Sequence, residues 1–344
     1  MKQSTRTGAK TILLSGGGGF LGVILCEQLL NSGFKVRILD KFYFGIDPLK
    51  HLSNKLEIIQ ADLRQPPLDI FNNIEVIIHL AGLSNDPTAE FNPKLNLEIN
   101  TAASINFAKM AKKAGVSRFI FASSCSIYDA GIQASSFLSD ENSSVDPKAA
   151  YSLSKYLAEK QLLKLKSENF CVVILRKGTI IGFSPRMRYD LVVNTMVKDA
   201  ISTGIIKLFC QGIQWRPVID VKDASDAYLK VMLAPKKIVN GQIFNIALDN
   251  FMVKNLAFLV QKVLKDKYKV KSNLKYLSIN KKDRSYKVST AKAKKVLNFR
   301  PKYQVEMSIH NLMSYISKGK FNDFKNPLYY NIDWMKPILE KEQI

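Results

Sequence analysis

The sequence lacks the features that mark membrane-spanning and disulfide-bonded proteins. It has no run of about 18 uninterrupted apolar residues, the length that a membrane helix needs. Its N-terminus is polar and contains no apolar segment of the kind that directs secretion. Cysteines are few, and their spacing fits neither a disulfide framework nor a metal site: Cys26, Cys125, Cys171 and Cys210. We therefore expect a metal-free protein of a reducing compartment, the cytoplasm.

Acidic residues are scarce relative to basic ones. The 344 residues include 51 Lys and Arg but 29 Asp and Glu, so the formal net charge is +22. Such a charge favours contact with nucleic acid, an anionic membrane surface or an anionic small substrate. The lysines are spread along the whole chain, however, and neither an RNP-type nor a helix-turn-helix signature is present. We therefore interpret most of the charge as solvated surface and expect no nucleic acid partner. An anionic substrate held by a few arginines fits either interpretation.

Short apolar strands alternate with helices in the first half of the chain. Expected strands span 11–15, 35–40, 55–62, 75–82, 118–124 and 170–176. Expected helices span 20–32, 97–114 and 151–168, and further helical stretches lie near 190–203, 223–233, 253–266 and 306–317. Several strands are near-continuous apolar runs, which indicates a parallel sheet covered by helices on both faces.

A glycine-rich loop joins the first expected strand to the first expected helix. Gly16, Gly19 and Gly22 follow the spacing G-x-x-G-x-x-G, and Asp40 ends the second strand 18 residues later. Glycines permit a tight turn close to a pyrophosphate, and the N–H groups that open the helix face its charge. An acid at the end of the second strand binds the adenosine ribose and repels a 2′-phosphate. The sequence thus predicts a dinucleotide cofactor, NAD rather than NADP.

Tyr151 and Lys155 are four residues apart, on one face of an expected helix, and Ser124 ends the preceding strand. A free phenol has a pKa near 10 and is a poor base at neutral pH. A nearby ammonium and an oxidised nicotinamide would lower that pKa. The phenolate would then take a proton from a sugar hydroxyl held by Ser124, while a hydride leaves the carbon.

In their order and spacing these segments resemble the extended short-chain dehydrogenase/reductase family, in its branch of nucleotide-sugar epimerases and dehydratases. The resemblance covers nearly the whole chain and rests on residues 15–22, 40, 61–62, 79–82, 98–100, 123–128, 151–155, 175–182, 215–223 and 289–301. It implies a Rossmann-like doubly wound parallel sheet over residues 1–176. A smaller mixed C-terminal substrate-binding lobe, residues 177–344, would make short excursions back to that domain.

The resemblance also implies roles for individual residues. The catalytic group would be Ser124, Tyr151 and Lys155. The NAD-binding residues would be Gly16, Gly19, Phe20, Leu21, Asp40, Asp62, Leu63, Ala81, Gly82, Asn100, Tyr151 and Lys155. The substrate would be a nucleotide-diphosphate sugar, bound by Ser84, Asn85, Ser126, Thr179, Arg186, Asn194, Arg216 and Arg284. In that set the two arginines Arg216 and Arg284 would clamp the diphosphate, which suits their forked donors.

Two departures from the family pattern bear on the reaction. Dehydratases of this branch carry an Asp-Glu pair after the catalytic Ser or Thr, whereas this chain has Cys125 and Ser126. A 4,6-dehydratase is therefore disfavoured, and we interpret Cys125 as a packing residue. Lys177 and Gly178 replace a pair that is usually aromatic and small, which alters how the sugar is held.

The expected function is therefore NAD-dependent 4-epimerisation of a nucleotide sugar through a transient keto sugar, in the setting of polysaccharide precursor synthesis. A nucleotide-sugar 4-dehydrogenase, a ketoreductase or a dehydratase remains open, and an RNA-binding relative of the same fold is a remote alternative. The family usually pairs subunits through the helices expected at 97–114 and 151–168, so we expect a homodimer.

Overall fold

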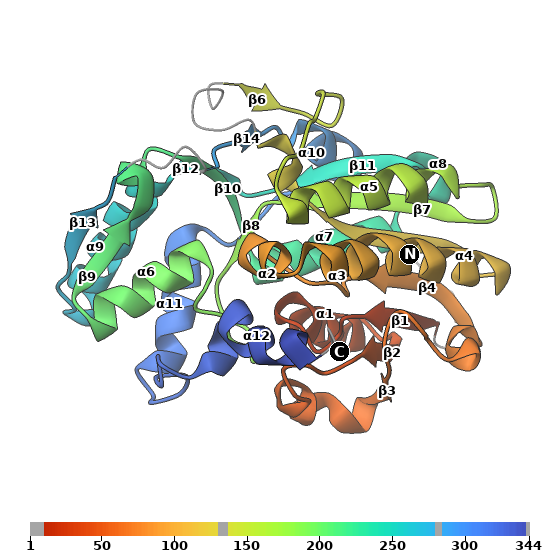
Figure 1. Cartoon of the computed structure of the whole chain (residues 1–344), viewed down its shortest axis with the longest axis horizontal. Coiled ribbons are helices and arrows are strands. Elements are labelled where there is room, and N and C mark those ends of the chain that lie inside the picture. The colour runs from red at the N-terminus through yellow and green to blue at the C-terminus, as the bar shows by residue number, and fades with distance from the viewer. Residues whose placement is uncertain (1–9, 130–136, 279–283, 342–344) are drawn as a thin grey trace, which may run out of the picture.

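The computed structural model describes residues 10–129, 137–278 and 284–341. A seven-stranded sheet forms its centre, and neighbouring strands run parallel throughout (Figure 1). In spatial order the strands are β11 (Gln242–Ile246), β7 (Cys171–Lys177), β5 (Arg118–Ser124), β4 (Ile74–His79), β1 (Thr11–Ser15), β2 (Lys35–Asp40) and β3 (Leu56–Gln60). The strand order reverses between β1 and β4, and ligands of such sheets bind at the carboxyl ends of the strands there.

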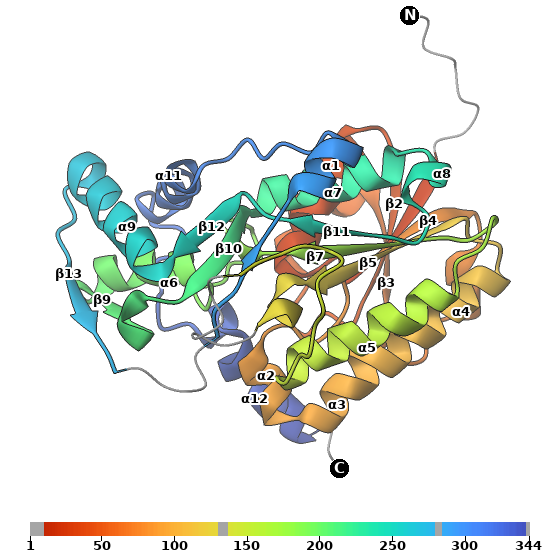
Figure 2. The ribbon, with the colours of Figure 1, turned by 90° about the horizontal axis from the view of Figure 1, so that it is seen from above.

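Helices cover both faces of this sheet, as the edge-on view shows (Figure 2). The covering helices are α1 (Phe20–Asn31) and α7 (Val221–Leu233) on one face, and α4 (Ser104–Lys113) and α5 (Ala150–Lys164) on the other. Successive strand residues point to opposite faces, so Ile12 and Leu14 pack in the core beneath the first pair of helices, whereas Leu13 packs beneath the second. The sheet therefore buries apolar side chains on both faces.

A smaller lobe has a core of its own. It contains a three-stranded sheet, a two-stranded sheet and three longer helices: β12 (Asp249–Met252), β10 (Trp215–Asp220), β8 (Thr179–Ile181), β13 (Asn273–Tyr276), β9 (Ile205–Leu208), α6 (Val192–Ser202), α9 (Val253–Tyr268) and α11 (Val305–Ile316). Figure 1 shows this lobe beside the carboxyl ends of the large sheet. A cavity between the two cores can therefore take residues from each.

The segment after β4 and the end of the chain lie together beside the sheet (Figure 2). The elements there are α2 (Asp86–Phe91), α3 (Pro93–Leu97), the π-helix η3 (Glu98–Ala103) and α12 (Asn331–Lys341). Met335 and Leu339 of α12 pack against Leu83 and Ile99 in a small apolar cluster. The C-terminal helix is thereby fixed next to the loop that follows β4.

The remaining elements are short and connect the larger ones. They are η1 (Asp47–Lys55), η2 (Leu68–Phe71), η4 (Cys125–Tyr128), β6 (Leu138–Ser139), η6 (Phe209–Gly212), α8 (Lys236–Val239), β14 (Lys287–Val288), α10 (Ala291–Leu297) and η7 (Pro327–Tyr329). Within the described ranges, no helix is both long and apolar enough to cross a membrane.

The expected doubly wound parallel sheet is confirmed, and the six expected strands form six neighbours in it. The seventh strand, β11, is a five-residue segment that the sequence pattern did not single out. The helix expected at 97–114 is a π-helical turn that continues into α4. The domain boundary at residue 176 stays a prediction, although β11 and α7 return to the large sheet from beyond it, as the expected excursions would.

Candidate active site

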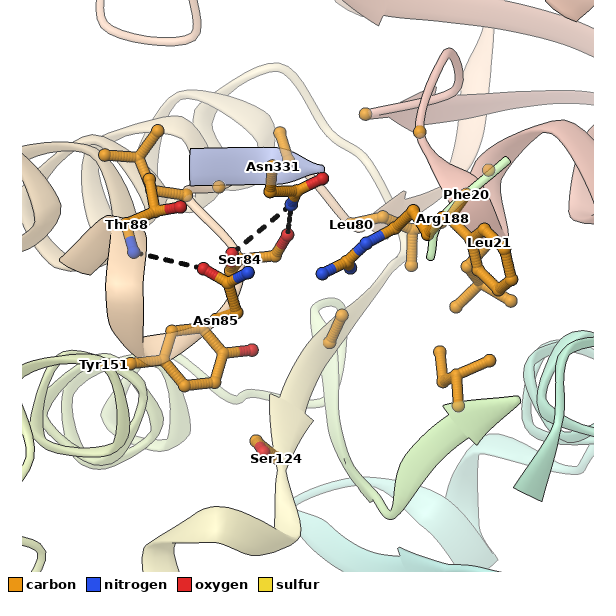
Figure 3. A pocket seen from close by; sticks show the side chains of 18 of the residues that line it. Phe20, Leu21, Leu80, Ser84, Asn85, Thr88, Ser124, Tyr151, Arg188 and Asn331 are labelled. Carbon is orange, nitrogen blue, oxygen red and sulfur yellow. Dashed lines mark hydrogen bonds between the residues drawn. The ribbon is translucent and has the colours of Figure 1, made fainter. Parts of the chain in front are cut away.

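A cavity of about 400 Å³ lies at the carboxyl ends of the central strands, between the large sheet and the smaller lobe (Figure 3). It is lined by nearly all of the residues that the sequence singled out; only Asn100 and Asn194 are missing from its wall. We refer to two ends of this cavity. The glycine-loop end is formed by Gly16, residues 18–22 and Asp40, and the arginine end by Arg188, Arg216 and Arg284 with their neighbours.

The glycine loop at the start of α1 fits closely against the segment after β4. Gly16 has a φ of 80°, and a Cβ placed on it would lie 2.6 Å from the backbone nitrogen of Ala81. A Cβ on Gly22 would lie 2.3 Å from the carbonyl oxygen of Gly16. Side chains are therefore excluded here, and the loop can pass directly beneath a ligand. No described side chain caps the first turn of α1, so its N–H groups remain available to an anion.

Asp40 ends β2 and is held at the glycine loop by backbone donors. It accepts hydrogen bonds from the N–H groups of Gly18 at 2.8 Å and Phe42 at 2.7 Å. Its burial raises the pKa of its carboxyl. Asp62 also lines this end, where Arg64 lies 2.6 Å from its carboxylate and, despite partial burial, holds the pKa of Asp62 well below its usual range. The expected positions Phe20, Leu21, Leu63, Ala81 and Gly82 line the same end.

The expected catalytic group is assembled in the middle of the cavity. Figure 3 shows the hydroxyls of Tyr151 and Ser124 facing the same open space. Ser124 donates a hydrogen bond of 2.9 Å to the hydroxyl of Ser126, which also lines the cavity. Lys155 lies one helical turn beyond Tyr151, with its ammonium 6.0 Å from the centre of the Tyr151 ring.

The ionisation of Tyr151 and Lys155 is shifted in opposite directions. Burial, together with repulsion from Lys177, lowers the pKa of Lys155 to about 7. Burial, and then the negative charge of Asp86, raises the pKa of Tyr151 above its usual value. The surroundings of each group therefore disfavour its charged form. When the phenolate and the ammonium are both present, their opposite charges stabilise each other.

Asn100 and Asn194 lie behind the cavity wall rather than in it. Asn100 accepts a hydrogen bond from the N–H of Leu83 at 2.8 Å and donates one to the carbonyl of Leu83 at 2.9 Å. Asn194 makes the equivalent pair of bonds to Gly182, at 3.0 and 2.8 Å. Because both amides are occupied by backbone groups, they shape the loops that line the cavity. Direct contacts of these two residues with cofactor and substrate stay predictions.

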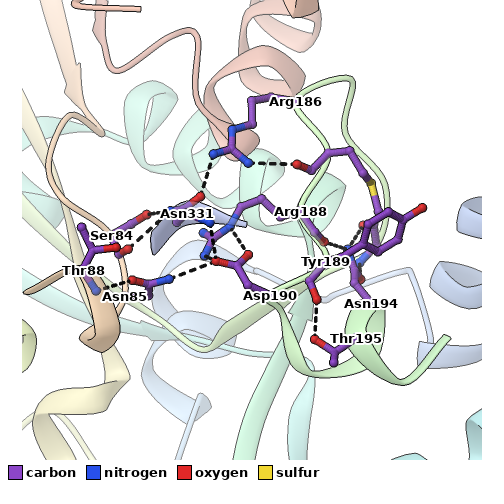
Figure 4. Close-up of polar contacts among 12 residues, drawn as sticks. Ser84, Asn85, Thr88, Arg186, Arg188, Tyr189, Asp190, Asn194, Thr195 and Asn331 are labelled. Carbon is purple, nitrogen blue, oxygen red and sulfur yellow. Dashed lines mark hydrogen bonds and ion pairs between the residues drawn. The ribbon is translucent and has the colours of Figure 1, made fainter. Parts of the chain in front are cut away.

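Three expected substrate residues, Ser84, Asn85 and Arg186, meet in one polar network (Figure 4). Asn331 links two of them, donating to the Ser84 hydroxyl at 2.8 Å and accepting from Arg186 at 2.6 Å. Asn85 donates to Asp190 at 3.0 Å. The network therefore joins the loop after β4, the loop after β8 and the start of α12.

Arg188 and Asp190 form the charged centre of this network. Two hydrogen bonds of 2.8 and 2.9 Å connect the guanidinium of Arg188 to the carboxylate of Asp190. Although burial opposes the effect, Arg188 holds the pKa of Asp190 below its usual range. In Figure 3 the tip of the Arg188 side chain faces the open space near Tyr151.

The expected pair Arg216 and Arg284 is brought together on the smaller lobe's side of the cavity. The guanidinium of Arg216 donates to the backbone carbonyl of Arg284 and lies 5.4 Å from the centre of the Tyr286 ring. Arg284 forms an ion pair of 2.5 Å with Asp86, at the start of α2. Thr179, the first residue of β8, lines the same cavity.

Three buried polar atoms of the cavity lining have no hydrogen-bond partner among the described residues. They are Oδ1 of Asp86, Oγ1 of Thr88 and Nη1 of Arg284. A buried polar atom without a partner is costly, so atoms of this kind commonly mark the place of a ligand or water. Together they offer acceptors and donors to a polar, partly anionic ligand.

Several lining residues were not among the predicted contacts. Arg188 and Asp86 lie in the segments 184–188 and 84–87, which the sequence places at the expected sugar pocket, but the predicted contacts there were Arg186, Ser84 and Asn85. Asn331 is more than a hundred residues away in sequence, and nothing in its surroundings indicated a role. Cys125, which we interpreted as a packing residue, is fully buried and donates from its Sγ to the carbonyl of Arg176 at 3.1 Å.

Known proteins resemble the chain in sequence and in fold. A model of the NAD dependent epimerase/dehydratase family matches residues 12–247. A proposed UDP-glucose 4-epimerase of Methanocaldococcus jannaschii is 29% identical over 236 residues, which are 67% of this chain and 75% of that protein. UDP-glucuronic acid decarboxylase 1 of Danio rerio is 26% identical over 230 residues, 65% of this chain. The chain spans about half of that decarboxylase, 54%.

Among solved structures, a UDP-glucuronic acid 4-epimerase from Bacillus cereus in complex with UDP-glucuronic acid and NAD has a similar fold. The TM-score is 0.78, and the superposition covers 90% of this chain and 99% of that one, at 21% sequence identity. At this identity the likeness establishes the fold.

Proposed function

This chain belongs to the NAD-dependent epimerase/dehydratase family, and we propose that it is a nucleotide-sugar epimerase acting at C4 of the sugar. It is an enzyme whose cofactor is NAD. Its relatives include epimerases and decarboxylases of UDP-sugars. The observation that carries the proposal is that Ser124, Tyr151 and Lys155 line one cavity with the glycine loop and Asp40.

The residues at the glycine-loop end fit NAD. The loop excludes a Cβ at Gly16, and the uncapped start of α1 offers N–H groups to a pyrophosphate. Asp40 would accept hydrogen bonds from the adenosine ribose, as a second-strand acid does in this fold. Held by these residues, NAD would supply the hydride acceptor, and afterwards the hydride donor, that epimerisation at the sugar carbon requires.

The side chains at the centre of the cavity would move the proton. Tyr151 would accept the proton of the C4 hydroxyl, and Ser124 would hold that hydroxyl by a hydrogen bond. Lys155 would stabilise the phenolate by its charge, which offsets the rise that burial causes in the pKa of Tyr151. After rotation of the keto sugar, the same three residues would return the proton on the other face.

The arginine end would bind the nucleotide diphosphate and the sugar hydroxyls. Arg216 and Arg284 are adjacent and would contact the phosphates. The unpartnered atoms of Asp86 and Thr88 are suited to hydroxyl groups, which both donate and accept hydrogen bonds. We keep Ser84, Asn85, Ser126, Thr179 and Arg186 as proposed substrate contacts, since all five line the cavity.

A 4,6-dehydratase is less well supported, because no carboxylate follows Ser124. Cys125 occupies the next position, and its burial raises the pKa of its thiol. The position after it, Ser126, carries a hydroxyl and no carboxylate. A nucleotide-sugar 4-dehydrogenase or ketoreductase would use the same Ser124, Tyr151 and Lys155, and only the release of NADH separates it from an epimerase.

The test is an assay of the purified protein with NAD and a panel of UDP- and dTDP-sugars, read by NADH absorbance and by product analysis. An altered sugar without accumulated NADH is the expected result. Accumulated NADH with a keto product would replace epimerase by dehydrogenase. Failure to convert or bind any sugar of the panel would contradict the proposal.

We also propose a homodimer formed through α5 and the helices that precede and include α4. Leu97, at the end of α3, and Leu157 of α5 are large apolar side chains more than a third exposed. Pairing of these helices would cover them. A monomeric mass by light scattering at micromolar concentration would contradict this, and a dimeric mass would support it. A cytoplasmic setting likewise stays a prediction.

A further inference from the structure

Lys177 places an ammonium group beside the proposed reaction centre. It is the last residue of β7 and is the register partner of Ser124, the last residue of β5. Its Nζ donates a hydrogen bond of 3.0 Å to the carbonyl of Ser123. Lys177 lines the same cavity as Ser124 and Tyr151. Its charge contributes to the lowered pKa of Lys155, but the mechanism above gives this ammonium no contact with the substrate.

Among the described residues, no carboxylate lies within ion-pair distance of Lys177. Every acid of the cavity lining is engaged elsewhere. Asp40 accepts from two backbone N–H groups. The other three are paired with cations: Asp62 with Lys41 and Arg64, Asp86 with Arg284, and Asp190 with Arg188. A half-buried ammonium with one carbonyl partner therefore lacks the counter-charge that removal from water normally demands.

Three further cations of the lining also have no carboxylate partner among the described residues, but each has a place in the proposed function. Lys155 serves Tyr151, and Arg216 lies with Arg284 at the proposed diphosphate contact. Arg186 stacks on Phe44, 3.5 Å from its ring centre, donates a hydrogen bond to Asn331, and is already kept as a proposed substrate contact. Once these are assigned, the charge of Lys177 is left over.

We propose that Lys177 binds a carboxylate carried by the sugar, so that the substrate is a nucleotide-activated uronic acid. This rests on the proposed function, since Ser124 and Tyr151 must hold the C4 hydroxyl. The carboxylate of a uronic acid is attached to C5, the carbon next to C4. An ammonium beside Ser124 is therefore near the right position on the ring for this group.

Two UDP-sugars that differ only at this group provide the probes. UDP-glucuronate has a carboxylate where UDP-glucose has a hydroxymethyl group. The NAD-loaded protein is titrated with each by calorimetry, and kcat and KM are measured for both. The variants are K177M, which keeps the length of the side chain without its charge, and K177R, which keeps a charge. Lys237→Met on exposed α8 is the matched control.

The wild type is expected to bind UDP-glucuronate more tightly than UDP-glucose. K177M should raise the Kd of UDP-glucuronate roughly 100-fold, which is the usual scale for removing one member of a buried charge pair. The Kd of UDP-glucose should change by less than about 3-fold. K177R should recover most of the preference, and Lys237→Met should match the wild type.

Other results would overturn the inference. If K177M weakens the binding of both sugars equally, Lys177 supports the strand ends or the cofactor and does not recognise a carboxylate. If the wild type converts both sugars and binds them with equal affinity, the proposed function stands, but the proposal of a uronic acid substrate is wrong. If the wild type binds neither but converts another, neutral sugar of the panel, the inference fails and the proposed function stands. If it binds no sugar of the panel, both fail. Should K177M fail to fold, the wild-type preference and K177R decide.

Discussion

At the glycine-loop end of the cavity the binding groups are mostly backbone, whereas at the arginine end they are side chains. The glycine-loop end is built from Gly16, residues 18–22 and Asp40, within a single strand–helix–strand unit. The arginine end collects Asn85, Arg188, Arg284 and Asn331 from loops and helices far apart in the sequence. The first arrangement suits an invariant cofactor, and the second can change residue by residue with the sugar.

Tyr151 lies between the two ends of the cavity. Its loss should stop the reaction without preventing NAD or the nucleotide sugar from binding. Tyr151→Phe removes the proton acceptor, so turnover should fall roughly 1000-fold, within the range of general acid–base catalysis. Binding of NAD and of the nucleotide sugar should change only a few-fold, as calorimetry would show. Tyr156→Phe, on the same helix but outside the cavity lining, is the control. Turnover within tenfold of the wild type would exclude Tyr151 as the base.

Gly16→Ala should damage the glycine-loop end alone. The new Cβ would meet the backbone of Ala81 at 2.6 Å, and the φ of 80° adds strain. We expect NAD affinity to fall about 100-fold, measured by calorimetry, with nucleotide-sugar affinity little changed. Gly33→Ala is matched, because its φ is 82° and no atom lies within 4 Å of the added Cβ. Equal losses of NAD affinity in both variants would show that strain, and not the close approach, is responsible.

Asn331→Ala should damage the arginine end alone, and by less. The amide joins Ser84 to Arg186, and the backbone N–H of Asn331 reaches Asp190 at 3.1 Å. Loss of the side-chain bonds to Ser84 and Arg186 should raise the Kd of the nucleotide sugar about 10-fold. NAD affinity should stay within 2-fold. Replacement of the exposed Asn322 by Ala is the control. A larger loss of affinity for NAD than for the nucleotide sugar would contradict the division of the cavity into two ends.

The same contrast explains what could be predicted from the sequence. The glycine-loop end and its six sheet strands depend on local patterns, namely apolar runs, glycine spacing and an acid at a strand end. Asn331 could not be found, because its position depends on how α12 packs against Leu83 and Ile99. Asn100 and Asn194 were placed in the site by resemblance, and only the fold reveals that their amides bind backbone. Side chains gathered from distant segments have no signature until the chain is folded.

Acid should destabilise the folded protein through His79 before it breaks the Arg188–Asp190 ion pair. His79 ties Ser15 of β1 to Ser104 of α4 through both ring nitrogens, at 2.6 and 2.8 Å. Burial lowers the pKa of His79 to about 3, so the folded protein keeps it neutral while the unfolded chain, with a pKa near 6.5, takes up a proton. Stability is therefore complete above about pH 6.5 and is lost as the pH falls towards 3. By contrast, the pKa of Asp190 is lowered, which keeps the Arg188 pair intact to more acidic pH.

At pH 5 the protonation of the unfolded chain at His79 should cost about 2 kcal/mol of folding free energy, a few degrees in Tm. The measurement is thermal unfolding by circular dichroism at pH 7 and pH 5 for the wild type and for His79→Gln, which cannot titrate. The drop in Tm should be smaller in the variant, whatever its Tm at pH 7, because only the slope reports the proton. Equal drops would mean that the acid sensitivity lies in other groups.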